Sequence, residues 1–190
     1  MRGPLPFRLA PVVLIIIGMG SVVGTMSAKQ IDPRHYEILG LTLFKDEMKD
    51  VDRKLGSAVE FRPPGSDFAE RCYASTGRDG TLLVLQNWAG TLVGFRIYHD
   101  SPTDNEKCIR TSAVSAQIAT AGGLRLGLTE ADVLKLLGKP TKTTSDSFTY
   151  HEDAKSRIKG KEGLFEYTDV NLRFANSKLV SIHVVHTVRD

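Results

Sequence analysis

Residues 127–140, GLTEADVLKLLGKP, carry the helix signals that decide the fold of this chain. Thr129 is expected to cap a helix, with Asp132 as its acidic partner three positions later, because this pairing satisfies free N–H groups of the first helical turn. The glycine and proline at the end of the stretch stop the helix. Its buried stripe is predicted to consist of three apolar residues at helical spacing: Val133, Leu136 and Leu137.

A related stretch lies earlier, at residues 40–56, GLTLFKDEMKDVDRKLG. Both stretches begin with Gly-Leu-Thr and reach Leu-Gly after a charged segment. Apolar residues at steps of four, three and four predict a helix within 42–56, about one turn longer than the other: Phe44, Met48, Val51 and Leu55. Two occurrences of one pattern predict a duplicated unit, in which a helix is followed by strands.

Segments rich in β-branched and aromatic residues follow each helix and are separated by turn residues. We expect strands at 58–61, 69–75, 81–88 and 91–99, and then at 143–151, 164–167, 170–175 and 179–187, with a hairpin turn at Asn176-Ser177. This order predicts an α+β fold of two repeated units, each a short helix or helix pair packed on an antiparallel β-meander. The first unit is expected at 35–108, a linker or short helix at 109–123, and the second unit at 124–187.

The first 28 residues have the layout of a secretory signal. Arg2 and Arg8 form a basic start, residues 9–20 are apolar, and small residues follow as far as Ala28. Two alternatives stay open. Residues 9–26 are 18 uncharged residues, near the lower limit for an uncleaved membrane anchor, and a buried core helix is the other reading. The leader favours a periplasmic or secreted protein, with anchoring in the inner membrane as the alternative if it is retained.

The charge balance argues against a nucleic-acid partner. Removing residues 1–28 removes two of the 25 Lys and Arg residues and none of the 22 Asp and Glu residues, which leaves 23 against 22. Nucleic-acid binders usually carry a clustered basic face. The basic run Lys155–Lys161, with four cations in seven positions, is a local exception. We interpret it as a solvated loop, with an anionic partner such as lipid headgroups or an acidic protein surface as the alternative.

Cys72 and Cys108 are the two cysteines of the chain. In an exported protein this pair is expected to form a disulfide, which would close a loop of 35 intervening residues. Chain entropy alone would then stabilise the fold by roughly 3 to 4 kcal/mol. Two reduced core thiols are the alternative if the leader is not a secretory signal. No zinc site is expected, because the clustered spacing of zinc ligands is missing.

The Gly-Leu-Thr start, the amphipathic helix, the Leu-Gly-Lys-Pro end and the later strands around LRFANSKLVSI, residues 172–182, together carry a resemblance. This pattern resembles the small α+β module of the BamE-like (SmpA/OmlA) envelope proteins and of β-lactamase-inhibitory-protein-like modules, and residues 124–187 match it best. The resemblance implies a bacterial periplasmic or secreted protein whose helices cover one face of an antiparallel sheet and which binds other proteins. The Thr and Gly positions of the motif cap helices, so they indicate fold and not function.

No catalytic residue, cofactor site or metal site is predicted from the motifs. Residues 122–127, GGLRLG, have the glycine spacing of a phosphate loop, but Leu128 stands where a lysine is required. His183 and His186 are three apart on an expected strand, so they should point to opposite faces and cannot easily share a metal. No serine lies in a Gly-x-Ser-x-Gly elbow, and neither cysteine lies in a Cys-x-x-Cys motif.

Aromatic residues on the expected strands are the remaining lead. Most are expected to pack in the core under the helices. An open sheet face would expose alternate side chains, and large rings there beside arginines, Arg71 among them, would make a protein-binding surface. The candidate residues of this surface are Trp88, at a strand end, with Tyr98, Arg96 and Arg173.

The sequence therefore favours a non-enzymatic, exported protein-binding module of the bacterial cell envelope, without a cofactor. Its partner would be an unidentified envelope protein, and the module would act in envelope assembly or as an inhibitor-like binder. Membrane contact is expected only if the leader is retained. Two alternatives remain: an envelope hydrolase with an unrecognised acidic or serine-based site, and a structural protein tethered to the inner membrane.

Overall fold

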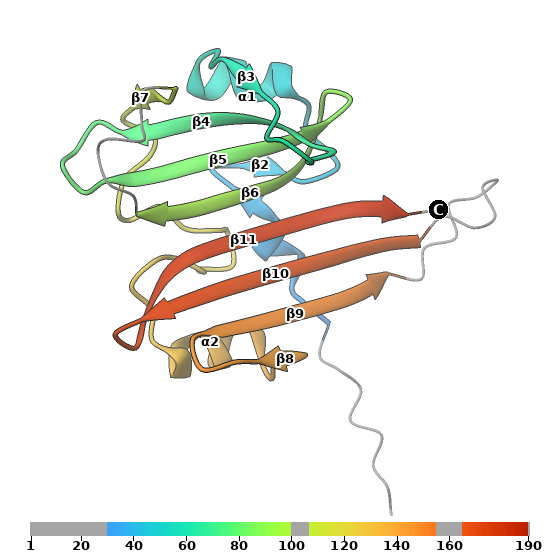
Figure 1. Cartoon of the computed structure of the whole chain (residues 1–190), viewed down its shortest axis with the longest axis vertical. Coiled ribbons are helices and arrows are strands. Elements are labelled where there is room, and N and C mark those ends of the chain that lie inside the picture. Colours follow the sequence, from blue (N-terminus) through green and yellow to red (C-terminus); the bar gives the residue numbers. More distant parts are fainter. Residues whose placement is uncertain (1–29, 100–106, 155–164, 190) are drawn as a thin grey trace, which may run out of the picture.

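The computed structural model of the chain describes residues 30–99, 107–154 and 165–189 (Figure 1). The predictions about the leader, residues 1–28, and about the basic run Lys155–Lys161 lie outside these residues. The described helices are η1 (Pro33–Tyr36, a 3-10 helix), α1 (Met48–Leu55) and α2 (Glu130–Leu137). The described strands are β1 (Glu37–Ile38), β2 (Leu41–Thr42), β3 (Glu60–Phe61), β4 (Ala69–Ser75), β5 (Thr81–Trp88), β6 (Thr91–His99), β7 (Ile109–Thr111), β8 (Lys142–Thr143), β9 (Ser147–Ala154), β10 (Phe165–Ala175) and β11 (Lys178–Arg189).

Nine of the described strands form one sheet, in the order β3-β4-β5-β6-β11-β10-β9-β8, and β7 pairs with β4 outside this path. The pairs along the path are antiparallel, whereas β7 runs parallel to β4. On each side of the central β6–β11 pair, a helix precedes a two-residue edge strand and three longer strands. The predicted α+β fold with a mainly antiparallel sheet is therefore confirmed. Duplication of one unit stays a prediction.

Helix α2 lies within the predicted stretch. Thr129 Oγ1 accepts a hydrogen bond from the Asp132 N–H at 3.2 Å, and the Asp132 carboxylate accepts one from the Thr129 N–H at 3.1 Å, so the capping box is complete. Gly138 follows the last turn with a φ of +79°, which glycine adopts without strain. Val133 and Leu137 of the predicted stripe are buried, and the third member is half-buried.

Helix α1 differs from the prediction, because it begins at Met48 and has eight residues, the same number as α2. The prediction of a longer first helix is wrong. The residues before it are held by pairing elsewhere: residues 41–42 form β2, and the Phe44 N–H donates to the Leu92 carbonyl at 2.7 Å. Phe44 has a φ of +62° and lies in a turn. Tertiary pairing has thus outweighed the helical periodicity. In the described ranges, no helix is long and apolar enough to cross a membrane.

Strands β4, β5 and β6 have the predicted bounds. β10 is continuous where two strands were predicted, because Thr168 and Asp169, the polar residues between the two segments, continue the pairing with β11. The segment expected as one strand at 143–151 is divided by a turn into β8 and β9. The predicted hairpin turn at Asn176-Ser177 connects β10 and β11, and both residues have positive φ.

Residues 109–123, predicted to be a linker or a short helix, contain no helix and begin with strand β7. Val114 and Ile118 are buried in the core of the protein. The Ala121 N–H donates to the Glu37 carbonyl at 2.9 Å. This segment is therefore part of the packed fold, and the boundaries of the two units stay a prediction.

The core lies on one face of the sheet, where both helices pack against alternate strand residues. It includes Val51 and Leu55 from α1, Val133 and Leu137 from α2, and Leu83, Leu85, Phe95, Ile97, Val170, Leu172, Ile182 and Val184 from the strands. In Figure 1 the long strands lie in front of the helices and of the blue segment that carries β1 and β2. The view is therefore onto the helix-free face. Helices on one face of an antiparallel sheet are what the sequence resemblance implied.

Candidate functional site

The helix-free side of β6, β9, β10 and β11 brings together three of the four residues predicted for a binding surface. Strand register places Arg173 opposite Ser181, and Ser181 opposite Tyr98, so these side chains form one row. Arg96 lies two residues before Tyr98 and therefore shares this face. We refer to the following side chains as the open face: Arg96, Tyr98, Thr149, His151, Asp169, Asn171, Arg173, Ser181 and His183.

The fourth predicted residue, Trp88, lies apart from the open face. Its side chain is 53% exposed at the end of β5, opposite Thr91. Tyr98 pairs with Leu82, six residues earlier on β5, so roughly 20 Å of strand separate Trp88 from that row. Arg71 points to the helix-covered face instead, where its guanidinium is 2.5 Å from a carboxylate oxygen of Asp52 on α1.

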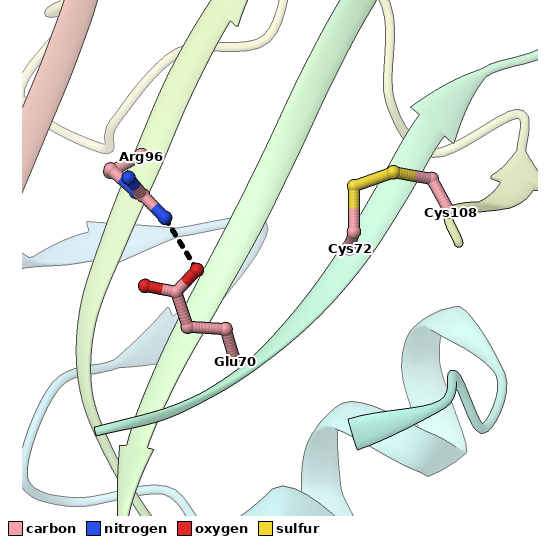
Figure 2. The surroundings of a disulfide bond; sticks show 4 residues. All are labelled: Glu70, Cys72, Arg96 and Cys108. Carbon is pink, nitrogen blue, oxygen red and sulfur yellow. Dashed lines mark hydrogen bonds and ion pairs between the residues drawn. A yellow bond between two sulfur atoms is a disulfide. The ribbon is translucent and has the colours of Figure 1, made fainter. Parts of the chain in front are cut away.

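A chain of polar side chains crosses the helix-free face from β4 to β11. Glu70 on β4 is 3% exposed and accepts hydrogen bonds from Arg96 Nη2 at 2.5 Å (Figure 2) and from Gln86 Nε2 at 2.9 Å. The Gln86 Oε1 atom lies 2.9 Å from His183 Nε2. Because the Gln86 amide nitrogen donates to Glu70, its oxygen is the acceptor, and this assignment places the proton of the neutral imidazole on Nε2.

Burial explains why His183, the histidine among these polar side chains, is uncharged. It lowers the pKa of His183 to about 4, and the nearby Arg96 charge adds to the effect, so His183 is neutral near pH 7. Gly94 leaves room for the Gln86 side chain and for strand β11, because a Cβ atom there would lie 2.7 Å from Gln86 Oε1 and 2.9 Å from the Val184 carbonyl oxygen. The packing at this point of β6 therefore requires glycine.

The two arginines of the open face have different surroundings. The Arg96 side chain is 35% exposed, is held by Glu70, and has a buried Nε with no hydrogen-bond partner among the described residues. Arg173 is exposed and makes no ion pair with another described residue. Arg173 can therefore meet an incoming carboxylate with its full charge, whereas Arg96 presents a guanidinium that is already fixed in place.

At the opposite end of the open face, His151 lies between two carboxylates. Its Nδ1 is 2.6 Å from Asp169 Oδ1, and its Nε2 is 3.0 Å from Asp153 Oδ1. The hydrogen bond to Asp169 raises the pKa of His151 above its usual value. Because carboxylates occupy both ring nitrogens, neither nitrogen is placed to accept a proton from a serine or threonine nucleophile.

His183 and His186 point to opposite faces, as predicted. On the helix-covered face, His186 Nδ1 is 2.6 Å from Thr168 Oγ1, and the His186 ring stacks on Tyr36 with a centroid distance of 5.7 Å. The Tyr36 hydroxyl donates to Glu152 at 3.1 Å, and burial raises the pKa of Tyr36. Over the part of the chain that the structure describes, no group of three or more His, Cys, Asp or Glu side chains is arranged to hold a metal ion.

Cys72 and Cys108 form the predicted disulfide, which Figure 2 shows beside the Glu70–Arg96 pair. Cys72 lies on β4 and is 3% exposed, and Cys108 directly precedes β7. The bond therefore holds β7 against β4. A disulfide in this position is typical of proteins that mature in an oxidising compartment.

Sequence reasoning missed the polar chain of Glu70, Gln86 and His183. These residues come from three strands, and the Gln86–His183 contact joins residues 97 positions apart. One signal was available, since Gly94 within an expected strand is typical of a close approach by another group. That signal does not identify the approaching group, because the partner depends on how the strands are ordered.

No protein-family profile and no curated protein sequence matches the chain. Among solved structures, the chain is similar to an extracellular protein containing an SCP domain from Bacillus anthracis, with a TM-score of 0.50 and 9% identity. The match covers 84% of this chain and 49% of that one, so this chain spans about half the length of its relative. At this identity the similarity concerns the fold alone.

A candidate β-lactamase inhibitor protein from Streptococcus mutans also matches, with 16% identity and a TM-score of 0.23. The match covers 76% of this chain and 82% of that one. This TM-score is too low to support a statement about a shared fold.

Proposed function

We propose that this chain is an exported, non-enzymatic protein that binds a protein partner of the bacterial cell envelope through its open face. The observation that carries the proposal is the separation of the two sheet faces. Helices and core lie on one face, whereas Arg96, Tyr98 and Arg173 share the other. Arginine and tyrosine are enriched at protein interfaces and supply much of their binding energy.

The open face is built to bind without much loss of conformational freedom. It lies on four paired strands, and Glu70 already fixes the Arg96 guanidinium. Ordering a mobile side chain on binding costs about 0.5 to 1.5 kcal/mol, and a fixed arginine avoids most of this cost. Tyr98 adds a large, stiff ring with few torsions to order.

The charges of the open face favour a partner with a particular pattern. Arg173 has no anionic partner among the described residues, so an acidic group of the binding protein would pair with it. Asp169 lies four residues before Arg173 on β10, and together with the neighbouring His151 it forms the other end of the open face. The proposed partner therefore presents a carboxylate to one end of the open face and a hydrogen-bonding or basic group to the other.

Export and modular construction are further parts of the proposal. The secretory layout of residues 1–28 and the disulfide between Cys72 and Cys108 both favour a periplasmic or secreted protein. The same order of helix and strands on each side of β6–β11 favours two related modules of the BamE-like or β-lactamase-inhibitory-protein-like kind. Envelope assembly and inhibitor-like binding would both use the open face.

Site-specific photo-crosslinking in the native host tests the proposal. A photoreactive phenylalanine analogue replaces Asn171, at the centre of the open face, and in a matched control it replaces Lys135, which is exposed on the opposite side in α2. We expect one crosslinked protein from position 171 and none from position 135. With that partner purified, Arg173→Ala and Tyr98→Ala should each raise the Kd by about tenfold or more, and Lys135→Ala should leave it unchanged.

Equal crosslinking from both positions, or an unchanged Kd in the Arg173→Ala and Tyr98→Ala variants, would overturn the assignment of the open face. Intact mass of the native protein tests export separately. A mass that lacks about 28 residues and includes one disulfide is expected. A full-length mass with two free thiols would contradict the proposed compartment.

A further inference from the structure

A hollow of about 330 Å³ lies on the helix-free face at the turn between β4 and β5, next to the Tyr98 side of the open face. Its lining comes from β4, β5, their connecting turn and β7. Register places it in the row that begins at Arg173, since Tyr98 pairs with Leu82, Leu82 with Ala74, and Ala74 with Arg110. Leu82, at the near side of the hollow, is thus paired with Tyr98 of the open face, whereas five strand spacings of about 4.8 Å, roughly 24 Å in all, separate Arg110 from Arg173.

The floor of the hollow is apolar and its rim is cationic. Ala74 and Leu82 are 3% and 2% exposed, and Arg78 and Arg110 line the hollow from the turn and from β7. Neither guanidinium forms an ion pair with another described residue. Two cations beside one concave apolar surface repel each other and attract an anion.

The acidic residue of the same turn, Asp79, forms no ion pair with Arg78 or Arg110. Asp79, in the same turn, is not part of the lining, and its carboxylate already accepts hydrogen bonds from the Thr81 and Ala116 N–H groups and from the Ser75 hydroxyl. These bonds lower the pKa of Asp79, so it stays ionised while it holds the turn in shape.

The position of Arg110 is fixed by two features of the fold. Strand β7 pairs with β4, and the disulfide from Cys108 to Cys72 ties the start of β7 to the same strand. The Arg110 Nη1 atom donates to the Ser75 carbonyl at 3.2 Å, which orients the guanidinium and leaves its other N–H groups for a ligand. The Arg110 guanidinium is therefore held in place before a ligand binds.

We propose that this hollow binds a small organic carboxylate, with its carboxylate between Arg78 and Arg110 and its apolar body against the mainly apolar surface of the hollow. The volume is at the lower end of the range for small-molecule sites, which fits a ligand of a few carbon atoms. An inorganic anion would use the arginines but leave the apolar surface of the hollow exposed to water. This site uses other side chains than the open face, which it borders at Tyr98, and the proposal does not rest on the proposed function.

A titration of the purified, oxidised protein with hexanoate, followed by amide chemical shifts at constant ionic strength, tests the proposal. Hexanamide, which has the same shape without the charge, is the matched ligand control. We expect saturable shifts at Gly77, Gly80 and Leu82 with a Kd on the order of 1 mM for hexanoate. Binding of hexanamide should be at least about tenfold weaker, because it cannot form charge-assisted hydrogen bonds with the arginines.

Variants that remove charge but keep a polar side chain complete the test. Arg78→Gln and Arg110→Gln should each weaken hexanoate binding several-fold, and the double variant should abolish the shifts. Arg173→Gln removes an exposed arginine of the same face and should leave the Kd unchanged. The proposal is overturned by equal affinity for hexanamide, by shifts that do not saturate, or by hexanoate binding that survives in the double variant.

Discussion

Tyr73 and Tyr150 occupy matching places in the two halves of the fold. Each phenol donates a hydrogen bond to the carbonyl of the glycine that ends its helix, Gly56 for Tyr73 and Gly138 for Tyr150, and both distances are 3.1 Å. Each tyrosine lies on the second strand after its helix. Burial raises the pKa of both phenols, for Tyr150 to about 12, so they remain donors at neutral pH.

Tyr73→Phe and Tyr150→Phe should therefore destabilise the protein by similar amounts. Each change removes one hydrogen bond and leaves a helix-end carbonyl without its donor, at a cost of about 1 kcal/mol, or about 2 to 4 °C in Tm. The two sites lie five strand spacings apart, roughly 24 Å, so the effects should add in the double variant. Urea unfolding of the three variants measures this. A change without effect at either position would show that its hydrogen bond does not hold the helix end.

The Arg96–Glu70 pair is expected to behave as a unit. Arg96→Met leaves the Glu70 carboxylate, 3% exposed, without its cation, and should lower the free energy of unfolding by about 2 kcal/mol. Adding Glu70→Gln to this variant removes the unpaired charge and should restore part of the loss. A double-mutant cycle from denaturant unfolding measures the coupling. Purely additive losses would mean that the pair contributes no interaction energy.

His183 should make stability depend on pH. Its pKa is lowered to about 4 in the folded protein from 6.5, so the unfolded chain takes up a proton more readily. Above about pH 6.5 the neutral imidazole makes its full contribution to the free energy of unfolding. This contribution, up to about 3 kcal/mol, is lost as the pH falls through 4. His183→Gln keeps an amide donor that does not titrate, and should lose less stability than the original protein between pH 7 and pH 4.5. Equal losses in urea unfolding would contradict this assignment.

His151 should titrate in the opposite direction from His183. The hydrogen bond to Asp169 favours the protonated imidazole and raises the pKa of His151, whereas burial lowers that of His183. In an NMR titration we expect the His151 midpoint above 6.5 and the His183 midpoint near 4. Asp169→Asn should lower the His151 midpoint and leave that of His183 nearly unchanged. A His151 midpoint that does not respond would show that the pair does not form in solution.

Local sequence signals predicted many elements well where the structure gave them no competing partner. The capping box of Thr129 and Asp132 depends on residues three positions apart, and α2 forms around it. The prediction failed at Phe44, whose helical spacing was correct but whose N–H is taken by Leu92 of β6. It also failed at residues 168–169 of β10, because polar residues were interpreted as a break although pairing with β11 continues through them.

The sequence predicted a binding surface on an open sheet face, but the structure was needed to show which residues form it. Period-two alternation places Arg96 and Tyr98 on one side of a strand from sequence alone. Their neighbour Arg173 comes from a strand more than 70 residues away in the chain, and only the pairing of β6 with β11 and of β11 with β10 brings it into the same row. The register of β5 with β6 also places Trp88 away from this row, although sequence reasoning had grouped it with the other three residues.

The sequence by itself determined the fold class, the C-terminal ends of both helices, the bounds of β4, β5 and β6 and the cysteine pair, because caps, turns and alternation act over a few residues. Tertiary structure decided which strands meet at β6–β11, which face stays free of helices, and which polar groups share it. The Gln86–His183 contact spans 97 positions, and the Arg110 hollow depends on β7 pairing with β4. Such contacts depend on the order and register of distant strands, which local patterns do not specify.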